Sequence, residues 1–114
     1  MPYLKIQTNQ PLDTAERQAL LQKASAEVAA QLGKSENYVM VAIEAGQNML
    51  FAGSPEPLAY LELKSIGLPE TATQDLSAAL CQLVSAELDI EQNRIYIEFA
   101  NAARHLWGWD GSTF

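Results

Sequence analysis

The chain has 114 residues, of which 48% are hydrophobic and 18% are charged, and its formal net charge is −7 at pH 7. This length and composition fit one ordinary domain over residues 1–114 and exclude a disordered or fibrous protein. Affinity for nucleic acid depends mainly on clustered lysine and arginine, so an acidic chain with seven scattered basic residues is not expected to bind it. No apolar run is long enough to cross a bilayer and the N-terminus lacks the pattern of a signal peptide, so we expect no membrane association and a cytoplasmic location.

The first half of the chain has the pattern of a strand, a helix and a second strand. Residues 2–8 alternate between apolar and polar, as a strand with one packed face requires. Residues 13–16 form a capping box, and apolar residues then recur at helical spacing until Gly33, which predicts a helix of about twenty residues. The segment 38–43 alternates again and predicts the second strand.

The second half begins with a connection, residues 45–57, to which a short apolar run at 49–52 adds a predicted short strand. Residues 58–65 alternate and predict a third strand. The capping-box pattern returns at 71–74 and precedes a second run of apolar residues at helical spacing. The clean alternation of residues 94–99 predicts the fourth strand.

The second half repeats the first at an offset of 56 or 57 residues. The matching positions include Leu4 with Leu61, Leu20 with Leu76, Val28 with Val84 and Val41 with Ile97. Two copies of a βαβ unit predict a pseudo-symmetric α+β fold. Right-handed crossovers place both helices on the same face of one four-stranded mixed sheet.

The other face of this predicted sheet is too mixed for a second core and too rich in tyrosine for an ordinary solvent-exposed face. We therefore expect an oligomer to cover part of it. The side chains assigned to this face are Tyr3, Lys5, Tyr60, Glu62, Lys64, Tyr96 and Glu98.

Two side chains with reactive chemistry receive a structural interpretation. Cys81 is the only cysteine, which excludes an internal disulfide, a CxxC redox pair and a cysteine metal cluster. It falls in a helical pattern and is expected to be a small buried hydrophobic residue. His105 lies in the irregular C-terminal segment and is expected to be a solvated loop residue.

Pro2 follows the initiator methionine at the head of the first predicted strand. Its small size permits removal of Met1, which would leave a secondary amine where every other X-Pro bond has a non-basic tertiary amide. The ordinary α-amino pKa of roughly 7.7–8.0 is close to neutrality, and burial or a nearby cation lowers it, so Pro2 is a candidate general base. The alternative is a strand-edge proline without chemical role, in a chain that keeps Met1.

A set of short motifs in fixed order runs along the whole chain. They are Met1-Pro2, Thr8-Asn9, Leu32-Gly33-Lys34, Gly53-Ser54-Pro55-Glu56-Pro57, Ser65-Ile66-Gly67, Arg94-Ile95-Tyr96-Ile97, Asn101-Ala102-Ala103 and the segment from Gly108 to Phe114. Together they resemble the macrophage migration inhibitory factor family of the tautomerase superfamily. The resemblance implies a homotrimer with active sites at subunit boundaries. It also implies keto–enol tautomerisation of α-keto acids such as phenylpyruvate, without a metal or an organic cofactor.

The resemblance also implies roles for individual residues. Pro2 would shuttle the proton, Lys34 would bind the substrate carboxylate, and the Ile66 backbone amide would add a donor. Tyr96 would enter the pocket from a neighbouring subunit. Apolar walls would come from Ile66, Tyr3, Trp107 and Phe114. Without the resemblance, Lys34 would be interpreted as a helix-terminal lysine that serves the helix dipole.

Three positions depart from the family pattern. Animal cytokine members carry a CxxC motif where this chain has Leu58-Ala59-Tyr60-Leu61, which excludes the associated thiol oxidoreductase activity. Trp107 replaces a smaller apolar wall residue. Glu98 stands where the cytokine has an amide side chain that bonds the substrate.

Glu98 shares a strand face with Tyr96, and three interpretations of its carboxyl group stay open. Ionised near Pro2, it would raise the pKa of the proline amine. Buried and protonated, it would donate a hydrogen bond to the substrate oxygen. Solvated, it would pair with Lys64 or Arg94 at little energetic gain.

Two functions compete at this stage, and a scaffold with neither role is a third possibility. The first is a proline-dependent tautomerase. The second is a cytokine-like signalling protein that binds a receptor or another protein partner through its trimer surface and keeps the pocket as a vestige.

Overall fold

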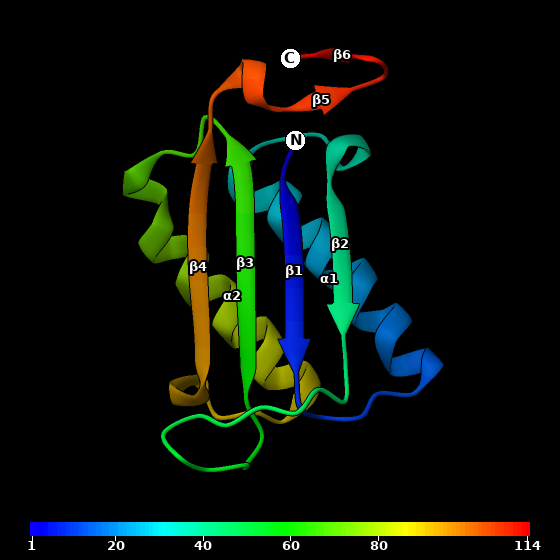
Figure 1. Ribbon diagram of the computed structural model, residues 1–114, viewed down its shortest axis with the longest axis vertical. Helices are drawn as coiled ribbons and strands as arrows, with labels where there is room; N and C mark the ends of the chain where they lie inside the picture. The colour runs from blue at the N-terminus through cyan, green and yellow to red at the C-terminus, as the bar shows by residue number, and fades with distance from the viewer.

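The computed structural model describes residues 1–114 and contains one mixed sheet of four strands in the order β2-β1-β3-β4 (Figure 1). The strands are β1 (Tyr3–Thr8), β2 (Met40–Glu44), β3 (Ala59–Ile66) and β4 (Ile95–Ala102). β1 pairs with β2 and β3 pairs with β4 in parallel, whereas the central pair β1 and β3 is antiparallel. The predicted arrangement of two βαβ units in one mixed sheet is confirmed.

Both helices, α1 (Thr14–Leu32) and α2 (Thr73–Leu88), cover the same face of the sheet, as the crossover rule predicts (Figure 1). The capping box of α1 is present: the Asp13 side chain accepts from the Glu16 amide over 2.8 Å, and the Glu16 side chain accepts from the Asp13 amide over 3.1 Å. At the other end Gly33 adopts φ +61°, a left-handed conformation that glycine tolerates without strain.

The second capping box, predicted at residues 71–74, is not formed. α2 begins after Ala72, whose side chain has no oxygen to accept an N-terminal amide hydrogen bond. The 3-10 turn η2 (Glu70–Ala72) leads directly into the helix, and the Thr73 hydroxyl donates to the Glu70 carbonyl oxygen over 2.9 Å. The first turn of α2 is thus a continued turn without a side-chain cap, which the four-residue pattern could not reveal.

The core lies between the helix layer and the covered face of the sheet. It includes the alternating residues of the central strands and the stripe on each helix: Leu4, Ile6, Leu61, Leu63, Leu20, Ala24, Val28, Leu76, Leu80 and Val84. Cys81 is half-buried and packs against this core, so its expected full burial is corrected to partial burial. Neither helix is long and apolar enough to cross a membrane.

Several boundaries differ from the sequence prediction: β3 lies one residue later at both ends, and β4 extends to Ala102. β2 begins at Met40, because residues 36–38 form the 3-10 turn η1 (Glu36–Tyr38). Arg94 ends the 3-10 turn η3 (Gln92–Arg94), so β4 begins one residue later than predicted. The expected short strand at 49–52 is absent, since only a single bridge between Phe51 and Ser54 forms there.

The C-terminal segment folds back over one end of the sheet, which the sequence did not predict. It consists of the 3-10 turn η4 (Arg104–Leu106) and a small hairpin of β5 (Gly108–Trp109) and β6 (Ser112–Thr113). His105 is exposed in η4. Figure 1 shows this hairpin above the N-terminus of β1, so both chain ends meet at the same end of the sheet, which we call the pocket end.

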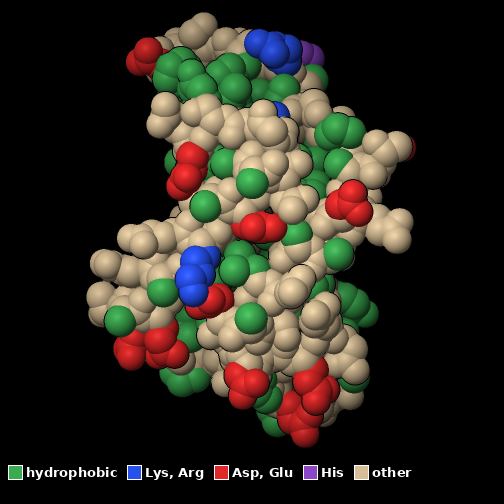
Figure 2. All heavy atoms as spheres, turned by 180° about the vertical axis from the view of Figure 1, so that it is seen from behind, with side chains coloured by type: hydrophobic (Ala, Val, Ile, Leu, Met, Phe, Trp, Pro, Cys, Tyr) green, Lys and Arg blue, Asp and Glu red, His purple; other side chains and the backbone are tan.

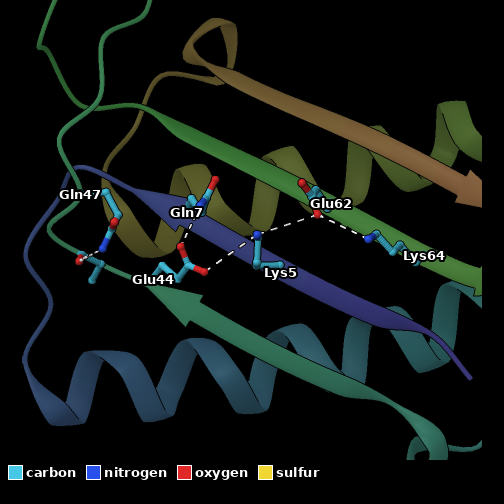
Figure 3. Close-up of polar contacts among 7 residues, drawn as sticks. Lys5, Gln7, Glu44, Gln47, Glu62 and Lys64 are labelled. Atoms are coloured by element: carbon cyan, nitrogen blue, oxygen red, sulfur yellow. Dashed lines mark hydrogen bonds and ion pairs between the residues drawn. The ribbon is translucent and has the colours of Figure 1, made fainter.

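The uncovered face of the sheet carries a row of charged side chains (Figure 3). Lys5 lies 3.9 Å from Glu44 and 4.0 Å from Glu62, and Lys64 lies 3.9 Å from Glu62. The Gln7 amide also donates to Glu44 over 2.7 Å. Because these ion pairs are partly solvated and at the upper distance limit, each stabilises the fold only slightly.

Candidate active site

A pocket of about 360 Å³ opens at the pocket end of the sheet, between the N-terminus, η1 and the C-terminal hairpin. Eight of its eleven lining residues are hydrophobic, and a concave apolar site with few polar groups is typical of small-molecule binding. The lining residues are Met1, Pro2, Tyr3, Asn37, Tyr38, Val39, Met40, Trp107, Gly108, Trp109 and Phe114. The structure thus brings Pro2 together with three of the wall residues expected from the sequence, Tyr3, Trp107 and Phe114.

Pro2 lies at the base of this pocket with its side chain fully buried. Its carbonyl oxygen accepts a hydrogen bond from the Met40 amide over 3.0 Å, which ties the N-terminus to the start of β2. Met1 occupies part of the pocket wall next to it. Pro2 is therefore tied to the start of β2, and Met1 and Pro2 both line the pocket.

Three aromatic rings form one wall. Trp109 and Phe114 stack with ring centroids 5.6 Å apart, and Tyr38 meets Trp109 edge to face at 5.8 Å. The Phe114 amide donates to the Trp107 carbonyl oxygen over 3.2 Å, which closes the hairpin over the pocket. Sequence reasoning did not assign Tyr38 and Trp109 to the site, and only their apolar, aromatic character gave a signal.

Lys34 follows the left-handed Gly33, which turns the chain from the end of α1 back toward the sheet. Its ammonium donates to the Ile66 carbonyl oxygen over 2.7 Å and to the Ser65 hydroxyl over 3.0 Å, at the end of β3. Burial, and secondly the charge of Arg104, lower the pKa of Lys34. Lys34 is therefore fixed at the pocket end as a partly desolvated cation.

The charge of Lys34 reaches the N-terminus. The pKa of the Met1 amine is lowered first by burial and then by Lys34, so the cation lies close enough to act on a basic group at the start of the chain. The Ile66 contact seen in the structure is made by its carbonyl oxygen. The donor role of the Ile66 amide stays a prediction.

Tyr96 and Glu98 do not line the pocket of their own subunit. In the register of the sheet Tyr3 is opposite Lys64, and Lys64 is opposite Ala100. Tyr96 is four residues before Ala100, or about 13 Å further down the strand at about 3.3 Å per residue. It is 65% exposed and packs on Phe51, with ring centroids 4.6 Å apart. One subunit therefore does not bring Tyr96 and Pro2 together, and the role of Tyr96 requires a second copy.

Glu98 has a partner that the sequence did not suggest. The Tyr60 hydroxyl donates to the Glu98 carboxylate over 2.5 Å, and this bond is the main cause that raises the pKa of Tyr60 to about 12. A pairing of Glu98 with Lys64 or Arg94, which one of the three open interpretations included, is not formed. Lys64 pairs with Glu62, and the Arg94 guanidinium donates to backbone carbonyl oxygens of the 51–57 segment.

Two fused βαβ units with a buried N-terminal proline at an apolar pocket define the fold of the tautomerase superfamily. The family model described as macrophage migration inhibitory factor (MIF) matches residues 1–114. A macrophage migration inhibitory factor homolog from Brugia malayi is 43% identical over 115 residues, which cover all of this chain and 99% of the relative. The macrophage migration inhibitory factor of Rattus norvegicus is 32% identical with the same coverage.

Solved structures agree with these sequence matches. The crystal structure of a macrophage migration inhibitory factor homologue from Prochlorococcus marinus superimposes with a TM-score of 0.92 at 42% identity, covering 98% of each chain. The protein from Trichinella spiralis gives a TM-score of 0.90 at 34% identity, over 98% of this chain and 99% of the other. The chain belongs to the macrophage migration inhibitory factor family.

Proposed function

We propose that this protein is a keto–enol tautomerase of phenylpyruvate-like α-keto acids, in which Pro2 is the general base once Met1 has been removed. The observation that carries this proposal is the position of Pro2. It is buried at the base of an apolar pocket, at the end of the sheet where Lys34 is fixed as a cation.

The chemistry follows from these two groups. The neutral Pro2 amine takes a proton from the carbon next to the keto group, and the electron pair of that C–H bond forms the enolate. The resulting prolinium returns the proton to the enolate oxygen, which gives the enol and regenerates the base. Lys34 attracts the substrate carboxylate, and its positive charge favours the neutral amine. The apolar walls strengthen both effects because they lower the local dielectric.

Met1 supports the proposal by its location. While Met1 is present, the Pro2 nitrogen is part of a tertiary amide and Met1 lines the pocket beside it. Removal of Met1 exposes a secondary amine on a residue whose carbonyl oxygen is already bound by the Met40 amide. It also removes one residue from the pocket lining.

We also propose a homotrimer in which Tyr96 of one subunit completes the pocket of the next. Apolar side chains are exposed at two separate places on one copy. Met40 and Trp109 are 65% and 56% exposed at the pocket end, and Leu50 and Tyr96 are 68% and 65% exposed at the other end. In a head-to-tail interface, one patch of each subunit contacts the other patch of its neighbour. Such an interface gives a closed ring when the rotation between subunits closes.

The test combines an intact mass with a phenylpyruvate assay. Protein without Met1 should be active, whereas protein with one alanine inserted between Met1 and Pro2 should be inactive, because its proline nitrogen stays an amide. Pro2→Gly should lose about 10²–10⁴-fold in kcat, the typical contribution of a positioned base. Full activity of the alanine-insertion protein would remove Pro2 from the mechanism. No activity in protein without Met1 would favour the signalling alternative, in which partner binding does not need a free proline amine.

A further inference from the structure

Most of the basic side chains in this acidic protein are already engaged. Lys5, Lys23 and Lys64 form ion pairs with glutamates, and Arg94 is bound by backbone carbonyl oxygens. Arg17, Lys34 and Arg104 form no ion pair with a carboxylate of the chain. Two of these three cations, Lys34 and Arg104, lie at the pocket end.

The sheet places Arg104 next to the Lys34 site. Ile66, whose carbonyl oxygen holds the Lys34 ammonium, is paired across the sheet with Ala102. Arg104 follows two residues later as the first residue of η4, which leads to the pocket residue Trp107. It is exposed, and Figure 2 shows basic side chains at the same end of the molecule as a group of hydrophobic side chains. The influence of Arg104 on the pKa of Lys34 agrees with this placement.

Lys34 alone has too few free donors to satisfy all the acceptor positions of a carboxylate. An ammonium group has three protons, and two of them are used by the Ser65 hydroxyl and the Ile66 carbonyl oxygen. One donor is left for a substrate carboxylate, which has two oxygens and about four acceptor positions. A carboxylate bound by Lys34 therefore keeps about three acceptor positions for other donors, and a nearby second cation can supply them.

We propose that Arg104 is a second carboxylate-binding residue, which together with Lys34 forms a two-cation cradle for the carboxylate of a 2-oxo acid. This inference rests on the proposed function, since it names a further residue that binds its substrate. The unpaired guanidinium offers five N–H donors in a planar fork that matches a carboxylate. Lys34 supplies the fixed charge at the pocket, and Arg104 supplies the missing hydrogen bonds.

The experiment measures binding separately from proton transfer. Benzoylformate is a 2-oxo acid with no hydrogen on the carbon beside its keto group, so it can bind without tautomerising. Calorimetry compares benzoylformate with its methyl ester in protein without Met1, in Arg104→Gln and in Arg104→Lys. Arg17→Gln is the matched control because Arg17 is also exposed and unpaired. It lies in the first turn of α1, about 22 Å along the helix from its C-terminal residue.

We expect the Arg104→Gln substitution to weaken benzoylformate binding about tenfold or more, the typical loss of a hydrogen bond to a charged group. Binding of the ester should change less than about twofold, and Arg104→Lys should restore part of the acid affinity. Arg17→Gln should bind the acid as the parent does. The same ratio of affinities should appear in kcat/KM for phenylpyruvate.

Three results would overturn the cradle. The first is a parent protein that binds benzoylformate no more tightly than its methyl ester. The second is an Arg104→Gln variant whose affinities for the acid and the ester fall by the same factor. The third is an Arg17→Gln variant whose affinity for the acid falls as much as that of Arg104→Gln. Failure of the proposed function looks different. In that case Arg104-dependent binding of benzoylformate would persist in a protein without Pro2-dependent turnover.

Discussion

The Lys34 ammonium donates a hydrogen bond of 2.7 Å to the Ile66 carbonyl oxygen, and this contact joins the end of α1 to the end of β3. It fixes the position of a positive charge beside the N-terminus, whose amine has its pKa lowered by that charge after the effect of burial. In the proposed mechanism this contact would link substrate binding to the basicity of the Pro2 amine.

The Lys34→Met substitution should affect both properties. Loss of the ammonium should lower kcat/KM for phenylpyruvate by about tenfold or more, because a hydrogen bond to a charged group is typically worth about 1.5–3 kcal/mol. It should also raise the pKa of the Pro2 amine, since a cation that favoured the neutral form is gone. The acidic limb of the kcat/KM profile should then move to higher pH. Lys23→Met, at an ion pair on α1 away from the pocket, is the control. An unmoved limb would show that Lys34 does not act on the base.

The Glu98→Gln substitution should change the titration of Tyr60. The Glu98 carboxylate is the main cause of the raised pKa of about 12, so the variant should titrate closer to the ordinary value of about 10. The raised pKa of Tyr60 adds to the free energy of unfolding, and this contribution is complete below pH 10. It is lost as the pH rises toward 12, because Tyr60 ionises near pH 10 in the unfolded chain but only near pH 12 in the folded one. An ultraviolet titration of tyrosinate between pH 9 and 12 measures this shift, and Tyr60→Phe identifies the step that belongs to Tyr60. Identical curves for parent and Glu98→Gln would contradict the assignment.

Glu98 also has a test in catalysis. An ionised Glu98 near the Pro2 of a neighbouring subunit would stabilise prolinium, so Glu98→Gln should move the acidic limb of kcat/KM to lower pH and improve turnover near neutrality. A protonated Glu98 that donates to the substrate would give the opposite result, a loss of activity. A profile identical to that of the parent would confine Glu98 to its bond with Tyr60.

Assembly can be tested by complementation between two damaged subunits. The Pro2→Gly chain keeps Tyr96, and the Tyr96→Ala chain keeps Pro2. In a mixed trimer, a pocket that takes Pro2 from one chain and Tyr96 from the other has both residues. Co-refolded mixtures should therefore exceed the summed activity of the two separate variants, and light scattering should give three times the subunit mass. A monomer, or a mixture with no gain, would rule out a shared site.

The capping box predicts a stability change away from the site. The Asp13→Ala substitution removes the acceptor of the Glu16 amide and should lower the free energy of unfolding by about 0.5–2 kcal/mol. Asp13→Asn keeps an acceptor and should cost much less. Denaturant unfolding monitored by circular dichroism compares the two variants. Equal losses would show that the charge of Asp13 matters more than its hydrogen bond.

The sequence by itself determined the architecture of this protein. Alternation over residues 2–8 and 94–99 predicted strands, the Asp13 box and Gly33 bounded α1, and the internal repeat predicted both helices on one face. These features are local, or they follow from one unit written twice, so periodicity and cap chemistry suffice to predict them. The chemistry of a proline amine freed by removal of Met1 identified Pro2 as a candidate base.

Only the tertiary structure decided which side chains meet. The Tyr60 to Glu98 bond joins residues 38 positions apart, and the Lys34 to Ile66 bond joins residues 32 positions apart. Tyr38 and Trp109 share the pocket because the C-terminal hairpin folds over the end of β1, and Arg104 approaches Lys34 because Ala102 is paired with Ile66. Strand register and chain reversal create these contacts, and neither leaves a periodic signal near the residues concerned. The physical reason is that a short sequence window encodes which face a side chain takes, whereas its partner is set by the packing of the whole sheet.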